Sequence, residues 1–288
     1  MRMAIERTLF IMNNKPLKPA ETLDACIEVG VGKANSSIPR LFVLGILAGA
    51  FIAFAAQGSN MAAFNLISSP DTFGIGKVLQ GALFAPGLVM VILAGGELFT
   101  GNVLMLASLA EKRISFAQLL RNWVIVYLGN LVGSVLIAYF VSTTGQWAGG
   151  AALLGGMTVK IAAGKTSLSF GAAFVLGILC NWLVCTAVWM SFAAESFIGK
   201  LFGIFLPIWL FVTSGFEHSI ANMYYIPAGI LAKGTEAFVQ ASGLAPDALA
   251  SLTWSGFFVS NLIPVTLGNI VGGGLFIALA YWFSFKKA

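Results

Sequence analysis

The sequence predicts an all-α integral membrane protein whose six transmembrane helices form an inverted repeat of three plus three. Three observations support this fold class: the composition, six apolar stretches of spanning length, and motifs shared by the two halves. Of the 288 residues, 58% are hydrophobic and 9% are charged, whereas a soluble domain has about 45–50% apolar and about 25% charged residues. We expect residues 1–37 to form a cytoplasmic N-terminal segment and residues 38–288 one transmembrane channel domain.

The polar N-terminal segment lacks the apolar core of a cleaved signal peptide. Within it, Leu23, Ile27 and Val31 recur at helical spacing, which predicts a short amphipathic helix over residues 20–33 that lies along the membrane surface. The three cysteines, odd in number, include two inside an apolar stretch and do not form a disulfide framework or a CxxC metal pair.

Six apolar stretches follow, each long enough to cross a bilayer core that needs about 20 residues per helix. Residues 143–165 and 234–255 are expected to be polar or Gly-rich joins. The predicted spans cover residues 38–57, 78–109, 116–142, 166–193, 200–231 and 255–284.

The basic residues of the chain are distributed unequally between the two sides of these spans. Twelve Lys and Arg residues lie on the side that carries both termini, and four, Lys77, Lys160, Lys165 and Lys233, lie on the other. The positive-inside rule therefore predicts a cell-membrane protein with both termini in the cytoplasm. Because the charges are scattered at the ends of apolar runs and form no stripe, they do not indicate nucleic-acid binding.

Two motifs occur once in each half of the chain. The segment Phe-Val-Leu-Gly-Ile-Leu is found at residues 42–47 and 174–179, and an Asn-x6-Gly-Asn-x2-Gly motif begins at Asn122 and at Asn261. Since each half has three spans, an odd number, the second copy must enter the membrane from the opposite side. Inverted repeats of this kind are typical of channels and transporters, with the pathway between the halves.

The second and fifth spans carry glycines and polar residues at matching places, residues 95–102 and 214–222. Such residues break a helix, and broken helices in both halves indicate a permeation site. Both breaks contain a glutamate, Glu97 or Glu217. These carboxylates could bind substrate cations, or they could hold the breaks together through backbone N–H groups, which is the structural interpretation we favour.

His218, the only histidine, lies in the fifth-span break. It could be a packing residue, but its place in a repeat-related break favours a functional role. Burial opposes the charged imidazolium and a nearby anion favours it, so the arrival of an anion and protonation of the ring would be coupled. Thr100 in the other break could donate its hydroxyl to an oxyanion, beside free N–H groups of residues 98–101, or could bond its own helix carbonyl. Apolar residues at helical spacing around these sites could form the core or pore constrictions: Phe84, Leu88, Phe99 and Phe211.

Four segments together resemble the formate/nitrite transporter family: Gly-Gly-Glu-Leu-Phe-Thr at 95–100, Gly-Ile-Leu-Cys-Asn at 177–181, Gly-Phe-Glu-His-Ser-Ile-Ala-Asn-Met at 215–223 and Asn-Leu-Ile-Pro-Val-Thr-Leu-Gly-Asn at 261–269. The resemblance covers nearly the whole chain. It implies an aquaporin-like protomer, assembled as a homopentamer in the lipid bilayer, with one pore per protomer for a small monovalent anion such as formate, nitrite or hydrosulfide.

The resemblance also implies roles for individual residues. The broken second span would gate the inner mouth of the pore, and Lys165 would draw anions into the outer vestibule. Carried over by motif position, the pathway consists of the central site (His218, Thr100), the outer constriction (Phe84, Leu88, Phe211), the inner constriction (Leu98, Phe99, Val184) and polar contacts (Asn181, Asn261).

A bare anion in an apolar constriction faces a Born cost of tens of kcal/mol in the idealised limit, whereas a neutral acid does not. We therefore expect proton coupling: the anion accepts a proton at His218, or from water relayed through it, and crosses as the acid. Formate is the first expected substrate, nitrite the second and hydrosulfide the third. No cofactor, metal or enzymatic activity is expected, since the sequence has neither HExxH nor GxGxxG. A neutral-solute channel is the alternative of another class, although neither break carries Asn-Pro-Ala.

Overall fold

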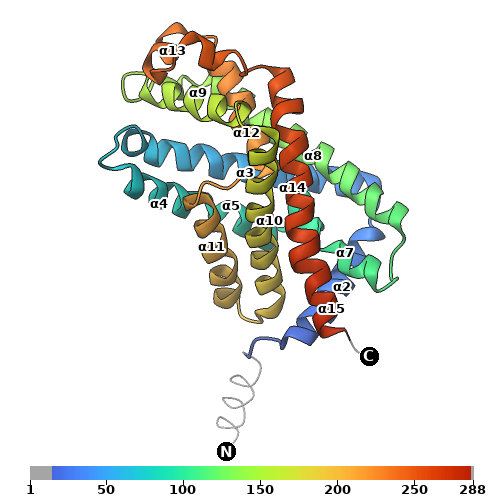
Figure 1. Ribbon diagram of the computed structural model, residues 1–288. Coiled ribbons are helices and arrows are strands. Elements are labelled where there is room, and N and C mark those ends of the chain that lie inside the picture. Colours follow the sequence, from blue (N-terminus) through green and yellow to red (C-terminus); the bar gives the residue numbers. More distant parts are fainter. Residues whose placement is uncertain (1–14, 287–288) are drawn as a thin grey trace, which may run out of the picture.

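The computed structural model describes residues 15–286 of the chain. Among these residues every regular element is a helix and none is a strand (Figure 1). The elements are α2 (Pro19–Ala34), α3 (Ile38–Ile67), α4 (Phe73–Phe84), α5 (Pro86–Met90), η1 (Val91–Gly95), α6 (Phe99–Asn102), α7 (Met105–Ala110), α8 (Phe116–Thr143), η2 (Gln146–Ala148), α9 (Leu153–Thr166), α10 (Phe170–Ala193), α11 (Phe197–Thr213), α12 (Ser219–Ala232), α13 (Glu236–Ser242), η3 (Pro246–Leu249), η4 (Gly256–Leu262), α14 (Ile263–Gly273), η5 (Gly274–Leu279) and α15 (Ala280–Phe285).

Five stretches of helix in the described part of the chain are long and apolar enough to span a bilayer. This finding confirms the prediction of an all-helical, multi-pass membrane protein. Two further apolar helices are shorter than a full span and cover Phe99–Ala110 and Phe197–Thr213. The long ones cover Ile38–Ile67, Phe73–Gly95, Phe116–Thr143, Phe170–Ala193 and Gly256–Phe285.

The first spanning helix, α3, is ten residues longer than the sequence predicted. Its predicted end at residue 57 was wrong, because the polar side chains near that position lie inside the protein and not in a solvent-exposed loop. Gln57 accepts a hydrogen bond from the Tyr224 hydroxyl at 2.6 Å, and Ser59 bonds Tyr225 at 3.2 Å. Buried polar groups are tolerated when they are hydrogen-bonded, so the helix continues to Ile67.

The two expected joins are also partly helical. Residues 143–165 include all but the last residue of α9, most of which is buried, and residues 234–255 contain α13 and η3. The glycines that suggested a loop instead allow close packing, because a side chain at Gly155 or Gly156 would collide with Phe238 or the backbone of Ala241 on α13. Figure 1 shows α9 and α13 side by side at one end of the molecule.

The predicted N-terminal helix exists as α2, but its apolar face is covered by the protein. Leu23, Cys26 and Ile27 are at most 5% exposed, and the Ser108 hydroxyl of α7 donates to the carbonyl of Ile27 at 2.9 Å. α2 also contacts α15, so the two ends of the described chain lie close together (Figure 1). The membrane-surface placement stays a prediction.

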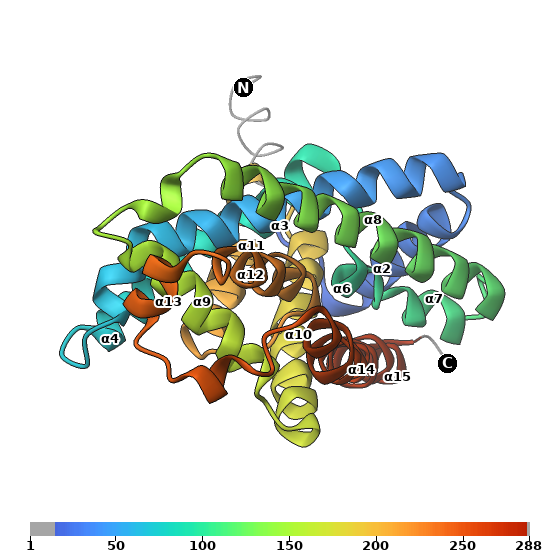
Figure 2. The ribbon, with the colours of Figure 1, turned by 90° about the horizontal axis from the view of Figure 1, so that it is seen from above.

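Glycines bring two pairs of spanning helices into close contact, α3 with α8 and α10 with α14 (Figure 2). A side chain on Gly129 would collide with the carbonyl of Phe42 and the backbone of Gly45, and one on Gly268 would meet Phe174 and Gly177 in the same way. Small residues at helix interfaces let backbones approach closely in membranes. The repeated Gly-Asn-x2-Gly motif therefore marks the same helix crossing in both halves.

Candidate functional site

Two short non-helical segments interrupt the bundle. η1 ends at Gly95 and α6 begins at Phe99, while α11 ends at Thr213 and α12 begins at Ser219. Gly95 has φ +90° and Gly215 has φ +76°, a left-handed conformation that glycine adopts without a steric cost. These glycines let the chain leave one helix and turn into the next inside the protein.

The first break is held by one asparagine from α8. The Asn130 side-chain amide donates to the carbonyls of Gly45 and Glu97, both at 2.8 Å, and its oxygen accepts the Phe99 N–H at 2.9 Å. Backbone groups freed by the break thus find partners without water, as a membrane interior requires. Because the Phe99 N–H is already bonded, the expectation that it is free to orient an oxyanion is wrong.

The second break has the same arrangement, made by Asn269 of α14. Its amide donates to the carbonyls of Gly177 at 2.8 Å and Glu217 at 3.0 Å, and its oxygen accepts the Ser219 N–H at 2.9 Å. Asn130 and Asn269 occupy the same place in the repeated sequence motif. The asparagine of this motif is therefore the side chain that supports each break.

The carboxylate of Glu97 lies in a polar cluster near the end of α2. It binds the Lys33 ammonium with both oxygens at 2.8 Å and accepts a bond from the Asn102 amide at 2.6 Å. Asn102 also donates to Asn122 at 2.8 Å. Among the described residues, the donors to this carboxylate are side chains, so the expected bonds to backbone N–H groups are not formed.

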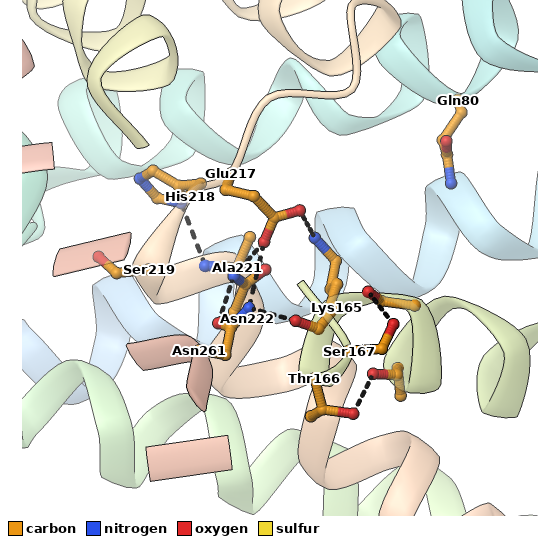
Figure 3. A network of polar contacts seen from close by, with 12 residues as sticks. Gln80, Lys165, Thr166, Ser167, Glu217, His218, Ser219, Ala221, Asn222 and Asn261 are labelled. Carbon is orange, nitrogen blue, oxygen red and sulfur yellow. Dashed lines mark hydrogen bonds and ion pairs between the residues drawn. The ribbon is translucent and has the colours of Figure 1, made fainter. Parts of the chain in front are cut away.

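Glu217 is surrounded in the same way in the second half (Figure 3). It binds the Lys165 ammonium at 2.7 Å and the Asn222 amide at 2.6 Å, and Asn222 donates to Asn261 at 2.7 Å. Asn261 in turn donates to the carbonyl of Lys165 at 2.9 Å. Lys165 and Asn261 are thus both tied to the glutamate of the break.

Thr100 and His218, which are 118 positions apart, meet between the two breaks. The Thr100 hydroxyl oxygen lies 2.8 Å from Nε2 of the imidazole, and Nδ1 accepts the backbone N–H of Ala221 at 3.1 Å. Because Nδ1 is an acceptor, the neutral ring carries its proton on Nε2 and donates it to Thr100. The threonine hydroxyl then keeps its own proton for another acceptor. Thr100 is 0% and His218 3% exposed.

The predicted polar contact Asn181 lies behind Thr100. Its amide donates to the carbonyl of Thr100 at 3.2 Å and to that of Asn269 at 2.7 Å, and the Cys185 thiol also bonds the Thr100 carbonyl at 3.3 Å. These bonds fix the backbone of Thr100 and leave its side chain directed at His218.

One cavity lies on each side of this central pair. The α2-side pocket has a volume of about 170 Å³, and its lining includes Lys33, Leu88 and Leu98. The α9-side pocket has a volume of about 280 Å³, and its lining includes Phe84, Lys165, Phe211 and His218.

The predicted constriction residues lie in three different settings. Phe84 and Phe211 face each other edge-on with their ring centroids 5.8 Å apart, and Leu88 lies four residues beyond Phe84 on the side of the other pocket. Leu98 borders the α2-side pocket, and Val184 is buried at 1% exposure. The Phe99 ring packs against Trp123 and Tyr127 with centroids 5.8 and 4.9 Å away.

Several residues of the site were missed in the sequence. The equal spacing of Glu97 to Asn102 and Glu217 to Asn222 could have revealed both amides as carboxylate partners. The Lys33–Glu97 pair gave no such signal, because the spacing between lysine and glutamate differs between the halves. Lys33 precedes Glu97 by 64 residues, whereas Lys165 precedes Glu217 by 52. Three further polar residues of the α9-side pocket were also missed: Lys77, Gln80 and Lys160.

The chain matches the family described as formate/nitrite transporter over residues 20–283. It is 42% identical to a probable formate transporter of Methanothermobacter thermautotrophicus over an alignment of 284 positions that covers 93% of this chain and 97% of that protein. It is 41% identical to the formate channel FocA of Escherichia coli K12 over 268 residues, 92% of this chain and 93% of that protein.

Solved structures show the same similarity. A pentameric formate channel with formate bound aligns with a TM-score of 0.79 and 41% identity over 87% of this chain and 98% of that one. An FNT family ion channel aligns with a TM-score of 0.73 and 29% identity over 92% and 98%. These relatives are channels and transporters, which confirms the expectation that the chain is not an enzyme. The chain belongs to the formate/nitrite transporter family.

Proposed function

We propose that this protein is a transmembrane channel for small monovalent anions, with formate as its first substrate. The observation that carries the proposal is the bond between Thr100 and His218, buried next to two pockets, one lined by Phe84, Phe211 and His218 and the other by Leu88 and Leu98. Relatives that are 41–42% identical are named formate channel or transporter, which supports formate over nitrite and hydrosulfide.

The proposed architecture is six spans in an inverted repeat, with the second span broken between η1 and α6 and the fifth between α11 and α12. Its support is the set of matching contacts around Asn130 and Asn269. From the excess of Lys and Arg on one side we infer that both termini lie in the cytoplasm and that the protein resides in the cell membrane. The similarity to a pentameric channel supports a homopentamer of such protomers, each an aquaporin-like pore.

The proposed mechanism couples the anion to a proton. An anion in the α9-side pocket reaches the Thr100 hydroxyl, whose proton is free because His218 supplies the other bond. An anion bound there accepts a proton from the protonated ring of His218, or from water relayed past it, loses its charge and crosses the apolar pore residues without the Born cost of an ion.

His218 contributes to this step in two ways. It orients Thr100 through Nε2–H, and it can take up a proton at Nδ1 once the Ala221 N–H releases that atom. Water relayed past the ring is the other source of the proton. In both cases one proton accompanies each anion, and the acid releases it on the far side.

Flux into proteoliposomes tests the proposal. Formate, nitrite and hydrosulfide are compared over a range of pH gradients, with His218→Ala beside the natural protein. Saturable formate uptake that increases with an inward proton gradient and is lost in His218→Ala would support the proposal. Uptake of only nitrite or hydrosulfide would change the substrate, and an unaltered proton dependence in the variant would remove His218 from the mechanism.

A further inference from the structure

The helix α4 presents three residues of different chemistry to the α9-side pocket. Lys77, Gln80 and Phe84 recur at i, i+3 and i+7, so they lie on one helical face, and all three line the pocket. The order along the helix is a charge, then an amide, then the ring that faces Phe211. An anion moving along this face toward the ring pair would meet Lys77 first and Gln80 second.

Packing between α4 and α11 holds this face in place. A side chain at Gly81 would collide with Trp209 and Thr213, so the two helices are in close contact there. The Trp209 indole N–H also donates to the carbonyl of Val78 at 2.8 Å. Lys77 and Gln80 are therefore carried by a fixed segment of helix.

The charges of the pocket are only partly compensated. Lys77, Lys160, Lys165 and Glu217 all line it. Glu217 binds Lys165 at 2.7 Å, whereas Lys77 donates to the neutral Gln80 amide oxygen at 2.9 Å and, within residues 15–286, has no carboxylate at ion-pair distance. Lys160 is exposed at the rim. The half-buried Lys77 is thus the uncompensated charge nearest the ring pair on this helix face.

Lys77 and Gln80 also have unused hydrogen-bond donors. An ammonium has three N–H bonds and an amide nitrogen two. Lys77 uses one on Gln80, and Gln80 uses one on the Asn60 oxygen at 3.2 Å. In Figure 3, Gln80 lies apart from His218 and from the Glu217 network. On the other side of the protein, the α2-side pocket has Lys33, whose charge is matched by Glu97.

We propose that Lys77 and Gln80 form a capture site for a monovalent oxyanion in the α9-side pocket, outside the Phe84–Phe211 pair and separate from Thr100 and His218. In this proposal Lys77 recruits the anion, while Lys165 serves as the structural partner of Glu217. This inference rests on the proposed function, because the captured anion is the one that permeates.

The test is formate uptake by proteoliposomes as a function of formate concentration, for the natural protein, Lys77→Met and Lys77→Arg. Removing one charge beside the anion should raise the half-saturating concentration about fivefold and leave the maximal rate within about twofold. Lys77→Arg should stay near the natural value, because the charge is kept. Gel filtration of each variant shows whether the protein is folded and assembled.

Lys160→Met is the matched control, since it removes the same charge from the exposed rim of the same pocket. Its effect should be smaller and should vanish in about 1 M salt, where the Debye length is about 3 Å, while that of Lys77→Met persists in part. An unchanged half-saturating concentration in a folded Lys77→Met protein would overturn the capture site alone. No formate uptake by the natural protein would overturn the proposed function and the capture site with it.

Discussion

The two helix breaks share a scaffold and differ in the residue that follows the glutamate. In each, a lysine and an asparagine bind the carboxylate and a second asparagine bridges the broken backbone. The next residue is Leu98 in the first break and His218 in the second. Leu98 makes no side-chain cap on α6, whereas His218 caps α12 through Ala221. The same hydrogen-bonding arrangement therefore positions two different side chains, Leu98 and His218. Of these two, only His218 can accept or donate a proton.

A second difference follows one and two residues later. Phe99 packs against Trp123 and Tyr127 in the first half, while its counterpart Ser219 is small and fully buried. Thr100 supplies the hydroxyl that meets His218, and its own counterpart is Ile220. The two breaks thus contribute complementary halves of one polar pair. The Thr100 hydroxyl and the His218 ring lie 2.8 Å apart where the two breaks meet.

Removing one glutamate should show the largest effect and should differ between the breaks. Glu217→Gln leaves Lys165 without a counter-charge, and breaking a buried pair costs about 3–5 kcal/mol. Glu97→Gln should cost less, because the Lys33–Glu97 side chains are 23% and 12% exposed against 16% and 7% for Lys165–Glu217. Thermal unfolding in detergent measures both.

The double variant Lys165→Met, Glu217→Gln is the control for that experiment. It removes both charges and should recover part of the stability lost in Glu217→Gln. Equal losses from Glu97→Gln and Glu217→Gln would contradict the difference in burial.

Asn130→Ala and Asn269→Ala test whether the supports are equivalent. Each removes two donated bonds and one accepted bond at a break and leaves buried backbone groups unpaired, which should cost about 1–3 kcal/mol. Thermal unfolding should show similar losses for the two variants. A loss at only one position would mean that the breaks are supported differently.

His218→Leu gives the second break the residue of the first. It removes the cap of α12, which should cost about 1 kcal/mol, and it removes the partner of Thr100, so proton-coupled formate uptake should fall. His218→Asn keeps a cap acceptor and should keep the stability while it loses the uptake. Stability and flux measured on the same preparations separate the two roles. Uptake retained in His218→Asn would show that the cap, and not the imidazole, is what matters.

One prediction concerns α2, whose Lys33 binds Glu97 as Lys165 of α9 binds Glu217. Burial raises the pKa of the Cys26 thiol to about 12, so at pH 8 the folded protein holds almost no thiolate there. Iodoacetamide should modify Cys26 roughly 1,000-fold more slowly at pH 8 than in the unfolded chain, as mass spectrometry of the peptide can show, and the rate should rise with pH up to about 12. Rapid modification at neutral pH would mean that α2 leaves α7 readily.

Much of the fold could be predicted because a bilayer imposes strong local constraints. Apolar runs must be helices there, and the glycines at residues 95–96 and 215 marked both breaks. The predictions failed where polar or Gly-rich residues suggested an end to a helix. Gln57 and Ser59 are satisfied by tyrosines of α12, and Gly155 and Gly156 allow contact with α13, and neither partner is visible in the local sequence.

The sequence by itself determined the all-helical membrane class and, through its long motifs, the family, because composition, periodicity and motifs are local properties of the chain. Only the tertiary structure decided which side chains meet. Two of the pairs join residues far apart in the chain, Lys33 with Glu97 and Thr100 with His218. Only Lys77 and Gln80 are also close in sequence. Long-range pairing depends on helix crossings, which are set by Gly–Gly contacts and bridging asparagines. The charge balance of each pocket is therefore fixed only after the helices have packed. Our proposal that Lys77, and not Lys165, recruits the anion depends on that charge balance.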